Sequence, residues 1–286
     1  MSGRTCNGHH HEETGQKGLI TLITPRESIG SIPAAPVVNS WEAWPFYIVC
    51  DVSSSMHDNN FAEYWGGGSE TETSPWKLMH QTLSEVVSKI SEDDDVRQQV
   101  HLSVVEFADG AKTTLRLTCA DRDGIFVPNF SKGGITDFAA VWEHLAEMIP
   151  KDQKELASNG FKSRRPTIFF ITDGKPDLGE ENRKQTTNDW KQYVYVMRRA
   201  IGDERLYPRI IAIGLGGMSN ENVLWELHSK NPHGAAVIAN HINKVSIVVQ
   251  AVIEQIENSI RDSALRGDFA WEVPEGMKNL CNLAAH

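Results

Sequence analysis

Short, wholly apolar runs alternate with amphipathic segments through most of this 286-residue chain. The run "FYIVC" at 46–50 has no polar position, which is typical of a strand covered by helices on both faces. Other segments place apolar residues at helical spacing, as do Met79, Leu83, Val86 and Ile90. The chain is therefore predicted to alternate strands with helices.

The same patterns predict the individual elements. Strands are expected at 46–51, 100–109, 111–118, 209–215 and 235–239, and within "PTIFFITDG" at 166–174. The strands 100–109 and 111–118 flank an Asp-Gly turn and read as an antiparallel hairpin. Helices are expected from Ser74-Pro75 to "SEDDD", from Asp137 to Pro150, and at 188–202, 220–229 and 242–263. We expect Pro150 to end its helix, because proline lacks the N–H that the helix requires.

This order predicts an α/β fold: a doubly wound, Rossmann-like open sheet, mostly parallel, with one antiparallel edge strand and helices on both faces. We expect one domain at 41–263, a flexible N-terminal arm at 1–40 and a C-terminal tail at 264–286. A polar insertion at 58–74 interrupts the domain after its first strand.

Composition narrows the function classes. The net charge is −10 and no basic stripe is present, which argues against a nucleic-acid surface. No apolar run is long enough to cross a bilayer, so no membrane insertion is expected, and the N-terminus lacks the apolar centre of a signal peptide. The four cysteines are scattered without paired spacing and read as free thiols. These features favour a cytoplasmic protein.

Three predicted loops carry candidate chemistry. Asp51 ends the first strand, and Asp173 follows "IFFIT" in the same manner. Ligands of open α/β sheets bind beyond the carboxyl ends of the strands, where strand order reverses, so these carboxylates converge if their strands are neighbours. Thr136 lies in the glycine-containing loop "SKGGITDF" before a helix, and Ser53 and Ser55 add two further hydroxyls.

Such a set of oxygen atoms favours a hard divalent cation. No suitably grouped Cys or His accompanies the acids, which disfavours zinc. Mg²⁺, for which Mn²⁺ or Ca²⁺ are alternatives, takes six or more oxygens, so two carboxylates and three hydroxyls leave part of its shell open. An Asp or Glu carboxylate from a protein partner would suit the open position.

At these residues the sequence resembles the von Willebrand factor A domain family. Its metal-ion-dependent adhesion site (MIDAS) has an Asp-x-Ser-x-Ser motif, a Thr in a glycine-rich loop and an Asp after an apolar strand. The positions that match here are Asp51, Ser53, Ser55, Thr136 and Asp173. The resemblance covers about residues 44–260 and implies protein binding rather than catalysis, so no enzymatic activity is expected.

Within that family, "CDVSSSM", "GGITDF" and "FFITDGKPD" look most like the bacterial TerY-like branch of tellurite-resistance and stress operons. The branch implies stress-response or signalling partners, possible kinases or phosphatases among them. This sequence departs from it at Ser54, where glycine is usual, and in the long insertion. Tyr64 and Trp65 in the insertion are candidate partner contacts, with burial against the domain's own surface as the alternative.

Two alternative interpretations remain open. An acid followed by serines after a strand also occurs as ordinary turn chemistry. Asp51 also resembles the nucleophile of Mg²⁺-dependent haloacid-dehalogenase-like phosphotransferases, with Lys175 binding phosphate and Asp173 or Asp177 binding the metal. Those enzymes need an acid two residues after the nucleophile, and here that position is Ser53.

Overall fold

The computed structural model describes residues 42–57, 74–174, 176, 185–215, 220–230, 234–239 and 245–281. The predicted arm at 1–40, nearly all of the insertion 58–74 with Tyr64 and Trp65, and the positions Lys175 and Asp177 lie outside these residues.

A central sheet runs through the described part of the chain, in the order β3-β2-β1-β5-β6-β7-β8. The strands are β1 (Glu42–Asp51), β2 (Val100–Phe107), β3 (Ala111–Cys119), β4 (Lys162–Ser163), β5 (Thr167–Thr172), β6 (Arg209–Gly214), β7 (Ala235–Ala239) and β8 (Met277–Asn279). The short β4 pairs with the start of β1, outside the main order. The predicted α/β sheet, mostly parallel, is confirmed.

Both edges of the sheet are antiparallel. The hairpin of β2 and β3 was predicted, and it forms one edge. The other edge is β8, which pairs with β7 through Val237–Asn279, Ile238–Lys278 and Ala239–Met277. This strand was not predicted, because its sequence "MKN" is short and mostly polar. Part of the segment expected as a tail therefore completes the sheet.

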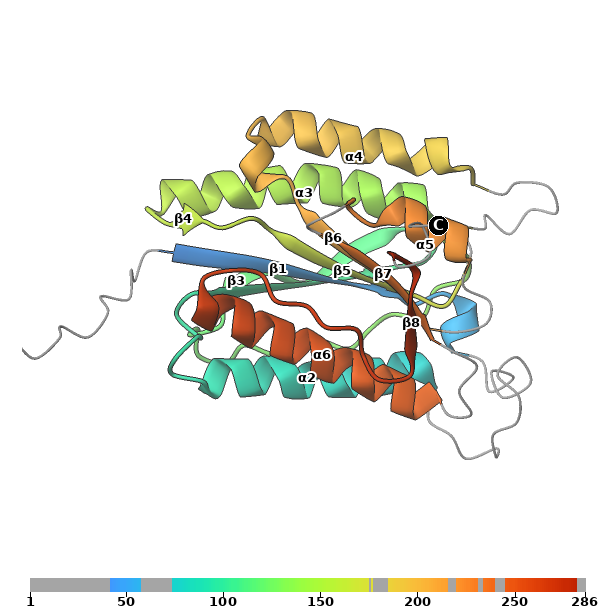
Figure 1. Cartoon of the computed structure of the whole chain (residues 1–286), viewed down its shortest axis with the longest axis horizontal. Coiled ribbons are helices and arrows are strands. Elements are labelled where there is room, and N and C mark those ends of the chain that lie inside the picture. The colour runs from blue at the N-terminus through green and yellow to red at the C-terminus, as the bar shows by residue number, and fades with distance from the viewer. Residues whose placement is uncertain are drawn as a thin grey trace, which may run out of the picture. The chain divides into compact units, whose positions relative to one another are not determined.

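Helices cover both faces of the sheet (Figure 1). They are α2 (Pro75–Glu92), α3 (Phe138–Ser158), α4 (Thr187–Ile201), α5 (Glu221–Leu227) and α6 (Val245–Arg266), with short 3₁₀ turns η1 (Ser54–Met56) and η2 (Glu204–Leu206). One core lies between the sheet and the pair α2 and α6, and the other lies under α3, α4 and α5. No described helix has the length and apolar character needed to span a membrane.

The apolar run of β1 is explained by these two cores. Phe46, Ile48 and Cys50 face the α2/α6 core, whereas Tyr47 and Val49 face the other. Since successive side chains of a strand point to opposite faces, a strand buried on both sides has no position for a polar residue. The first polar side chain after this run, Asp51, therefore marks the end of the strand.

The prediction that Pro150 ends its helix is wrong. Helix α3 begins after Asp137, whose carboxylate caps it by accepting from the Ala140 N–H, and it continues through the buried Pro150 to Ser158. Beyond the proline, Gln153 and Leu156 are also buried. Burial of this last part of the helix offsets the hydrogen bond that the proline removes.

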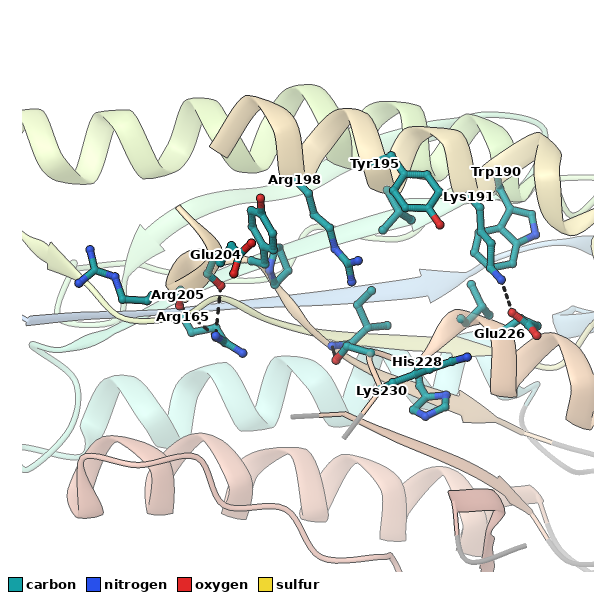
Figure 2. Close-up of a pocket in the computed structure, with 16 residues that line it drawn as sticks. Arg165, Trp190, Lys191, Tyr195, Arg198, Glu204, Arg205, Glu226, His228 and Lys230 are labelled. Carbon is teal, nitrogen blue, oxygen red and sulfur yellow. Dashed lines mark hydrogen bonds and ion pairs between the residues drawn. The ribbon is translucent and has the colours of Figure 1, made fainter. Parts of the chain in front are cut away.

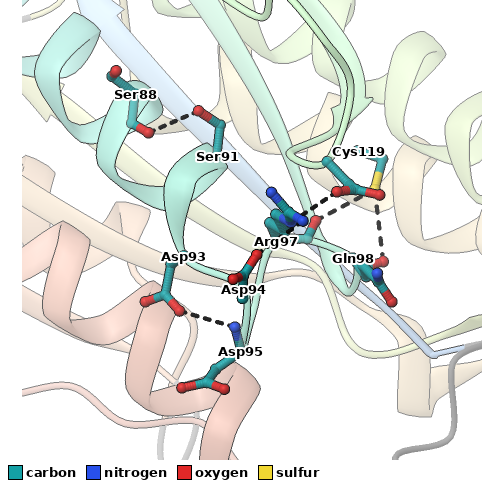
Figure 3. A network of polar contacts seen from close by, with 9 residues as sticks. Ser88, Ser91, Asp93, Asp94, Asp95, Arg97, Gln98 and Cys119 are labelled. Atoms are coloured by element: carbon teal, nitrogen blue, oxygen red, sulfur yellow. Dashed lines mark hydrogen bonds and ion pairs between the residues drawn. The ribbon is translucent and has the colours of Figure 1, made fainter.

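A polar network joins the end of α2 to β2 and β3 (Figure 3). Arg97 forms ion pairs with Asp94 (2.8 Å) and Asp121 (2.9 Å), and the Cys119 thiol donates to the Arg97 carbonyl. Arg261 of α6 pairs with Asp93 at 3.0 Å. The turn after α2 is thus linked to α6 through Asp93 and to the strand hairpin through Arg97.

Candidate metal site

The candidate site lies at the carboxyl ends of β1 and β5, where strand order reverses. β1 pairs in parallel with β2 on one side and with β5 on the other. In the strand order, the chain therefore moves toward one edge of the sheet after β1 and toward the other edge after β5. The sequence argument required β1 and β5 to be neighbours, and they are. Such a reversal point separates the following loops and leaves room for a ligand between them.

Asp51 is the last residue of β1 and its side chain is fully buried. One carboxylate oxygen, Oδ1, accepts from the Ser53 N–H at 2.9 Å. The other, Oδ2, accepts from the Thr172 hydroxyl at 2.6 Å. The carboxylate is therefore held in one orientation by the loop that follows β1 and by the end of β5.

A chain of hydroxyl contacts joins the first loop to Asp173. Ser55, on η1, donates from its Oγ to Asp173 Oδ1 at 2.9 Å. The Ser53 and Ser55 hydroxyl oxygens are 3.1 Å apart. Ser55 is exposed, whereas Ser53 and Asp173 are buried. The structure thus brings Ser55 into direct contact with the acid of the other loop, and Ser53 reaches that acid through Ser55.

Thr136 faces the same space from a third loop. A Cβ atom placed on Gly174 would lie 3.4 Å from Thr136 Oγ1 and 4.0 Å from Asp51 Oδ2. Thr136 is itself buried. All the predicted ligand positions therefore gather at one place, and Gly174 keeps the floor of that place free of a side chain.

The Thr136 loop is held by contacts that the sequence argument did not identify. Asp109 accepts from the backbone N–H groups of Gly134 (2.6 Å) and Ile135 (3.2 Å), and these hydrogen bonds lower the pKa of its carboxyl. Gly133 donates to the Val52 carbonyl at 3.0 Å. Asp109 had been interpreted only as part of the hairpin turn, and nothing local in "ADG" signals its contact with a distant loop.

Thr172 is a second residue that sequence reasoning missed. Its hydroxyl donates to Asp51 and accepts from the Gly174 N–H at 3.1 Å. The available signal was weak, because a threonine that ends an apolar strand is common in any sheet.

Electrostatics favour a cation between the two acids. Burial raises the pKa of Asp51. Burial, together with the charge of Asp51, raises the pKa of Asp173 to about 8. Two buried carboxylates so close to each other are costly unless positive charge compensates them. The described residues contain no group of three or more His, Cys, Asp or Glu side chains placed to hold a metal, so a cation here would depend on two acids and on hydroxyl donors.

The donor set fits a divalent cation that prefers oxygen. Asp51 and Asp173 supply negative charge, and the hydroxyls of Ser53, Ser55 and Thr136 are neutral donors from the other loops. Sulfur and imidazole ligands are absent from this set, as expected for Mg²⁺-type rather than structural zinc sites.

The arrangement of these loops agrees with a match to a known family. Residues 46–175 match the family model of the von Willebrand factor type A domain. The von Willebrand factor type A match runs from β1 to the loop after β5, so it includes every predicted ligand position. It supports the resemblance at the level of the domain, whereas the TerY-like branch and an intact adhesion site stay predictions. No curated protein sequence matches the chain.

Solved structures share the fold at low identity. The PilB minor pilin from Streptococcus sanguinis matches with a TM-score of 0.52 and 11% identity, covering 78% of this chain and 62% of the pilin. This likeness supports the fold alone. Proximal thread matrix protein 1 from the mussel byssus, with a zinc-occupied MIDAS motif, matches with a TM-score of 0.45 and 19% identity, covering 77% of this chain. The chain spans about half the length of the mussel protein, 48% or 47% in two of its structures.

A third structure, a von Willebrand factor type A protein from Catenulispora acidiphila, has a TM-score of 0.43 and 15% identity. The match covers 77% of this chain and 43% of that protein.

Proposed function

We propose that Asp51, Ser53, Ser55, Thr136 and Asp173 hold a divalent cation, and that the protein is a metal-dependent binding module for an acidic protein partner. The observation that supports this most directly is the contact between loops. Ser55 bridges to Asp173, and Asp51 is fixed from β5. These residues come from separate parts of the sequence, and both acids are buried where the loops meet.

The charge balance of the site indicates the class of partner. When bound, the cation would offer an open coordination position to a partner's Asp or Glu carboxylate. The two acids of this chain balance one divalent ion and its other donors are neutral, so no surplus negative charge repels that carboxylate. Mg²⁺ is the expected ion, with Mn²⁺ or Ca²⁺ as alternatives, because all of the donors are oxygens.

Within this proposal the role is binding and not catalysis. The resemblance to the TerY-like branch supports a cytoplasmic partner in a stress-response or signalling assembly, such as a kinase, a phosphatase or another protein of a stress operon. Tyr64 and Trp65 are proposed as further partner contacts.

The phosphotransferase alternative is disfavoured by position 53. Ser53 donates its backbone N–H to Asp51, and its hydroxyl contacts that of Ser55. A serine hydroxyl does not act as a general acid near neutral pH, so the leaving group of a phosphate ester would lack its proton donor. Incubation of the protein with an aryl phosphate and Mg²⁺ tests the phosphotransferase alternative. Hydrolysis by the wild type that Asp51→Asn abolishes would favour an enzyme.

A two-part experiment tests the binding module. Mn²⁺ is titrated into the wild-type protein, Asp51→Ala, Thr136→Ala and the control Thr118→Ala by calorimetry. Thr118 is a half-buried residue of β3 whose hydroxyl contacts only the nearby Arg116 carbonyl. We expect Mn²⁺ to bind saturably to the wild type and to Thr118→Ala. We expect this binding to be lost in Asp51→Ala and in Thr136→Ala.

The same proteins then serve as baits in extract of the native cell, with Mg²⁺ or with EDTA. The expected partner is captured only with Mg²⁺ and only by the wild type and Thr118→Ala. Capture that survives EDTA and both site substitutions would show that the metal site does not dock the partner.

A further inference from the structure

A separate pocket runs along α4 and reaches the amino ends of β5 and β6 (Figure 2). Its volume is about 650 Å³, within the range of small-ligand pockets. It is bounded by α4, by η2 and the residues after it, and by the segment that follows α5. Arg165 and Pro208, which precede β5 and β6, lie on its wall, so one end of the pocket lies at the amino ends of these strands.

The pocket is basic although the chain is acidic overall. Five Arg or Lys residues line it against two Glu, whereas the whole chain has a net charge of −10. One of the acids, Glu226, is paired with Lys191. The surplus of positive charge is therefore concentrated on the remaining basic side chains.

Three of those side chains have no carboxylate partner among the described residues. Arg165 donates to the backbone carbonyls of Arg205 (3.0 Å) and Glu204 (3.2 Å), which hold its guanidinium in place without neutralising it. Arg198 reaches down from α4 into the pocket (Figure 2). The exposed Lys230 forms no ion pair with any residue that the structure describes.

The setting of Arg198 indicates a missing acceptor. Its guanidinium carbon lies 5.8 Å from the centre of the Tyr207 ring. Its Nε atom is buried and has no hydrogen-bond partner in the described part of the chain. A buried N–H without an acceptor costs free energy, so an anion in the pocket would satisfy a donor that the protein leaves open.

Burial and the charges of Arg165 and Lys230 lower the pKa of neighbouring groups, although burial is the larger cause and the acids Asp268 and Glu226 act in the opposite direction. Burial, followed by the charge of Arg165, lowers the pKa of the adjacent Arg209 to about 10. Lys230 contributes, after burial, to a lowered pKa of His228. An anionic ligand would relieve this repulsion.

We propose that this pocket binds a small phosphate ester, whose phosphate contacts Arg198 and the exposed Lys230, while Arg165 adds positive charge farther along the pocket. Arginine matches the geometry of phosphate with paired N–H groups, and lysine adds a point charge. The organic part would lie against Tyr195, an aromatic side chain that lines the pocket and is 65% exposed. This proposal is independent of the candidate metal site, with which the pocket shares no lining residue.

Calorimetry on the full-length protein tests whether the pocket binds a phosphate ester. Inorganic phosphate, glucose 6-phosphate and AMP are titrated at constant ionic strength in the presence of EDTA, so that no phosphate binds through a cation. At least one ester is expected to bind saturably and about tenfold more tightly than inorganic phosphate. Tighter binding of AMP than of the sugar phosphate would assign the Tyr195 surface to a base, and the reverse result would assign it to a sugar.

Matched variants locate the binding. Arg198→Gln and Lys230→Gln should each weaken the ester by about tenfold, as loss of one charge-assisted hydrogen bond implies. Lys154→Gln removes the same charge from an exposed position of α3 outside the pocket and should change nothing. Lys230 is exposed, so its variant keeps the test valid if Arg198→Gln fails to fold.

Absence of binding by both esters overturns the proposal. So does binding that is equal for inorganic phosphate and the esters, or binding that Arg198→Gln and Lys230→Gln leave unchanged.

Discussion

At the scale of single residues, Thr172 connects the fold to the candidate metal site. Its hydroxyl donates to Asp51 and accepts from the backbone of Gly174. It is fully buried and is not among the predicted ligands. Groups of this kind orient the residues that contact a metal, and their loss usually lowers affinity without removing a ligand.

Thr172→Val should therefore keep the fold and weaken Mn²⁺ binding by about tenfold. The substitution preserves shape but removes the donor to Asp51 Oδ2. Calorimetric titration measures the affinity, and circular dichroism checks the fold. Thr118→Val, on β3, is the matched control. Unchanged affinity in Thr172→Val would show that Asp51 does not depend on this hydrogen bond.

A second residue-scale effect concerns Asp152, which accepts a hydrogen bond from Tyr47 at 3.1 Å. Burial raises the pKa of Asp152 from 3.8 to about 6. The folded protein thus binds this proton more tightly than the unfolded chain. The penalty on the folded state is full above about pH 6 and disappears as the pH falls below 3.8.

Asp152→Asn should stabilise the protein at pH 7.5 and have a smaller effect at pH 4. The gain at pH 7.5 should be below about 1 kcal/mol, because a half-buried site is partly screened by solvent. Urea unfolding at the two pH values measures it. Glu143→Gln makes the same charge change at an exposed position of α3 and serves as control. A stabilisation that is equal at both pH values would contradict the assigned cause.

At the scale of elements, the loop between β3 and α3 is positioned by close backbone packing. A Cβ atom on Gly133 would lie 2.0 Å from the Cβ of Ala108, which follows β2. Gly134 donates to Asp109 in the same region. The absence of side chains at these glycines allows the loop to approach β2 and to carry Thr136 to the site.

Gly133→Ala should consequently destabilise the protein by about 1–3 kcal/mol, as overpacking generally does, and should also weaken Mn²⁺ binding. Gly110→Ala is the matched control, since a Cβ atom there meets nothing within 4 Å. It should change the free energy of unfolding by less than about 0.5 kcal/mol. Urea unfolding compares the two, and equal stability would show that the loop can move away from Ala108 at little cost.

Element boundaries show which local rules tertiary packing can override. The start of α3 followed from Asp137, because capping is a local interaction that the sequence displays. The end of α3 did not, since burial of residues beyond Pro150 compensates a local disadvantage. Strand β8 depends entirely on its partner β7, and no property of "MKN" alone predicts it.

At the scale of the whole molecule, the candidate site depends on strand order. The alternation of elements predicted the α/β fold, and the rule for reversal points predicted where Asp51 and Asp173 would meet. Contacts made by Thr172 and Asp109 were not predictable, because they join segments far apart in sequence whose register is set only by the folded sheet. The basic pocket was missed for the same reason, since its residues come from several separate segments.

Cation binding should be visible as stabilisation of the whole molecule. A ligand that binds only the folded state at ten times its Kd adds about 1.4 kcal/mol. For a domain of this size that corresponds to a rise in Tm of about 3–5 °C. Differential scanning fluorimetry with Mg²⁺ or Mn²⁺, compared with EDTA, measures the rise. Asp173→Asn should show none, and an equal rise in that variant would place the cation elsewhere.

The hydrogen bond from Thr172 to Asp51 spans 121 positions of the chain, and that from Ser55 to Asp173 spans 118. During translation, the nascent polypeptide cannot make either contact until β5 has emerged from the ribosome. A product of premature termination between Ser55 and Asp173 contains the Asp-x-Ser-x-Ser motif but lacks its counterpart. Under the proposed function, such fragments lack one ligand of the cation and would not compete with the finished protein for its partner.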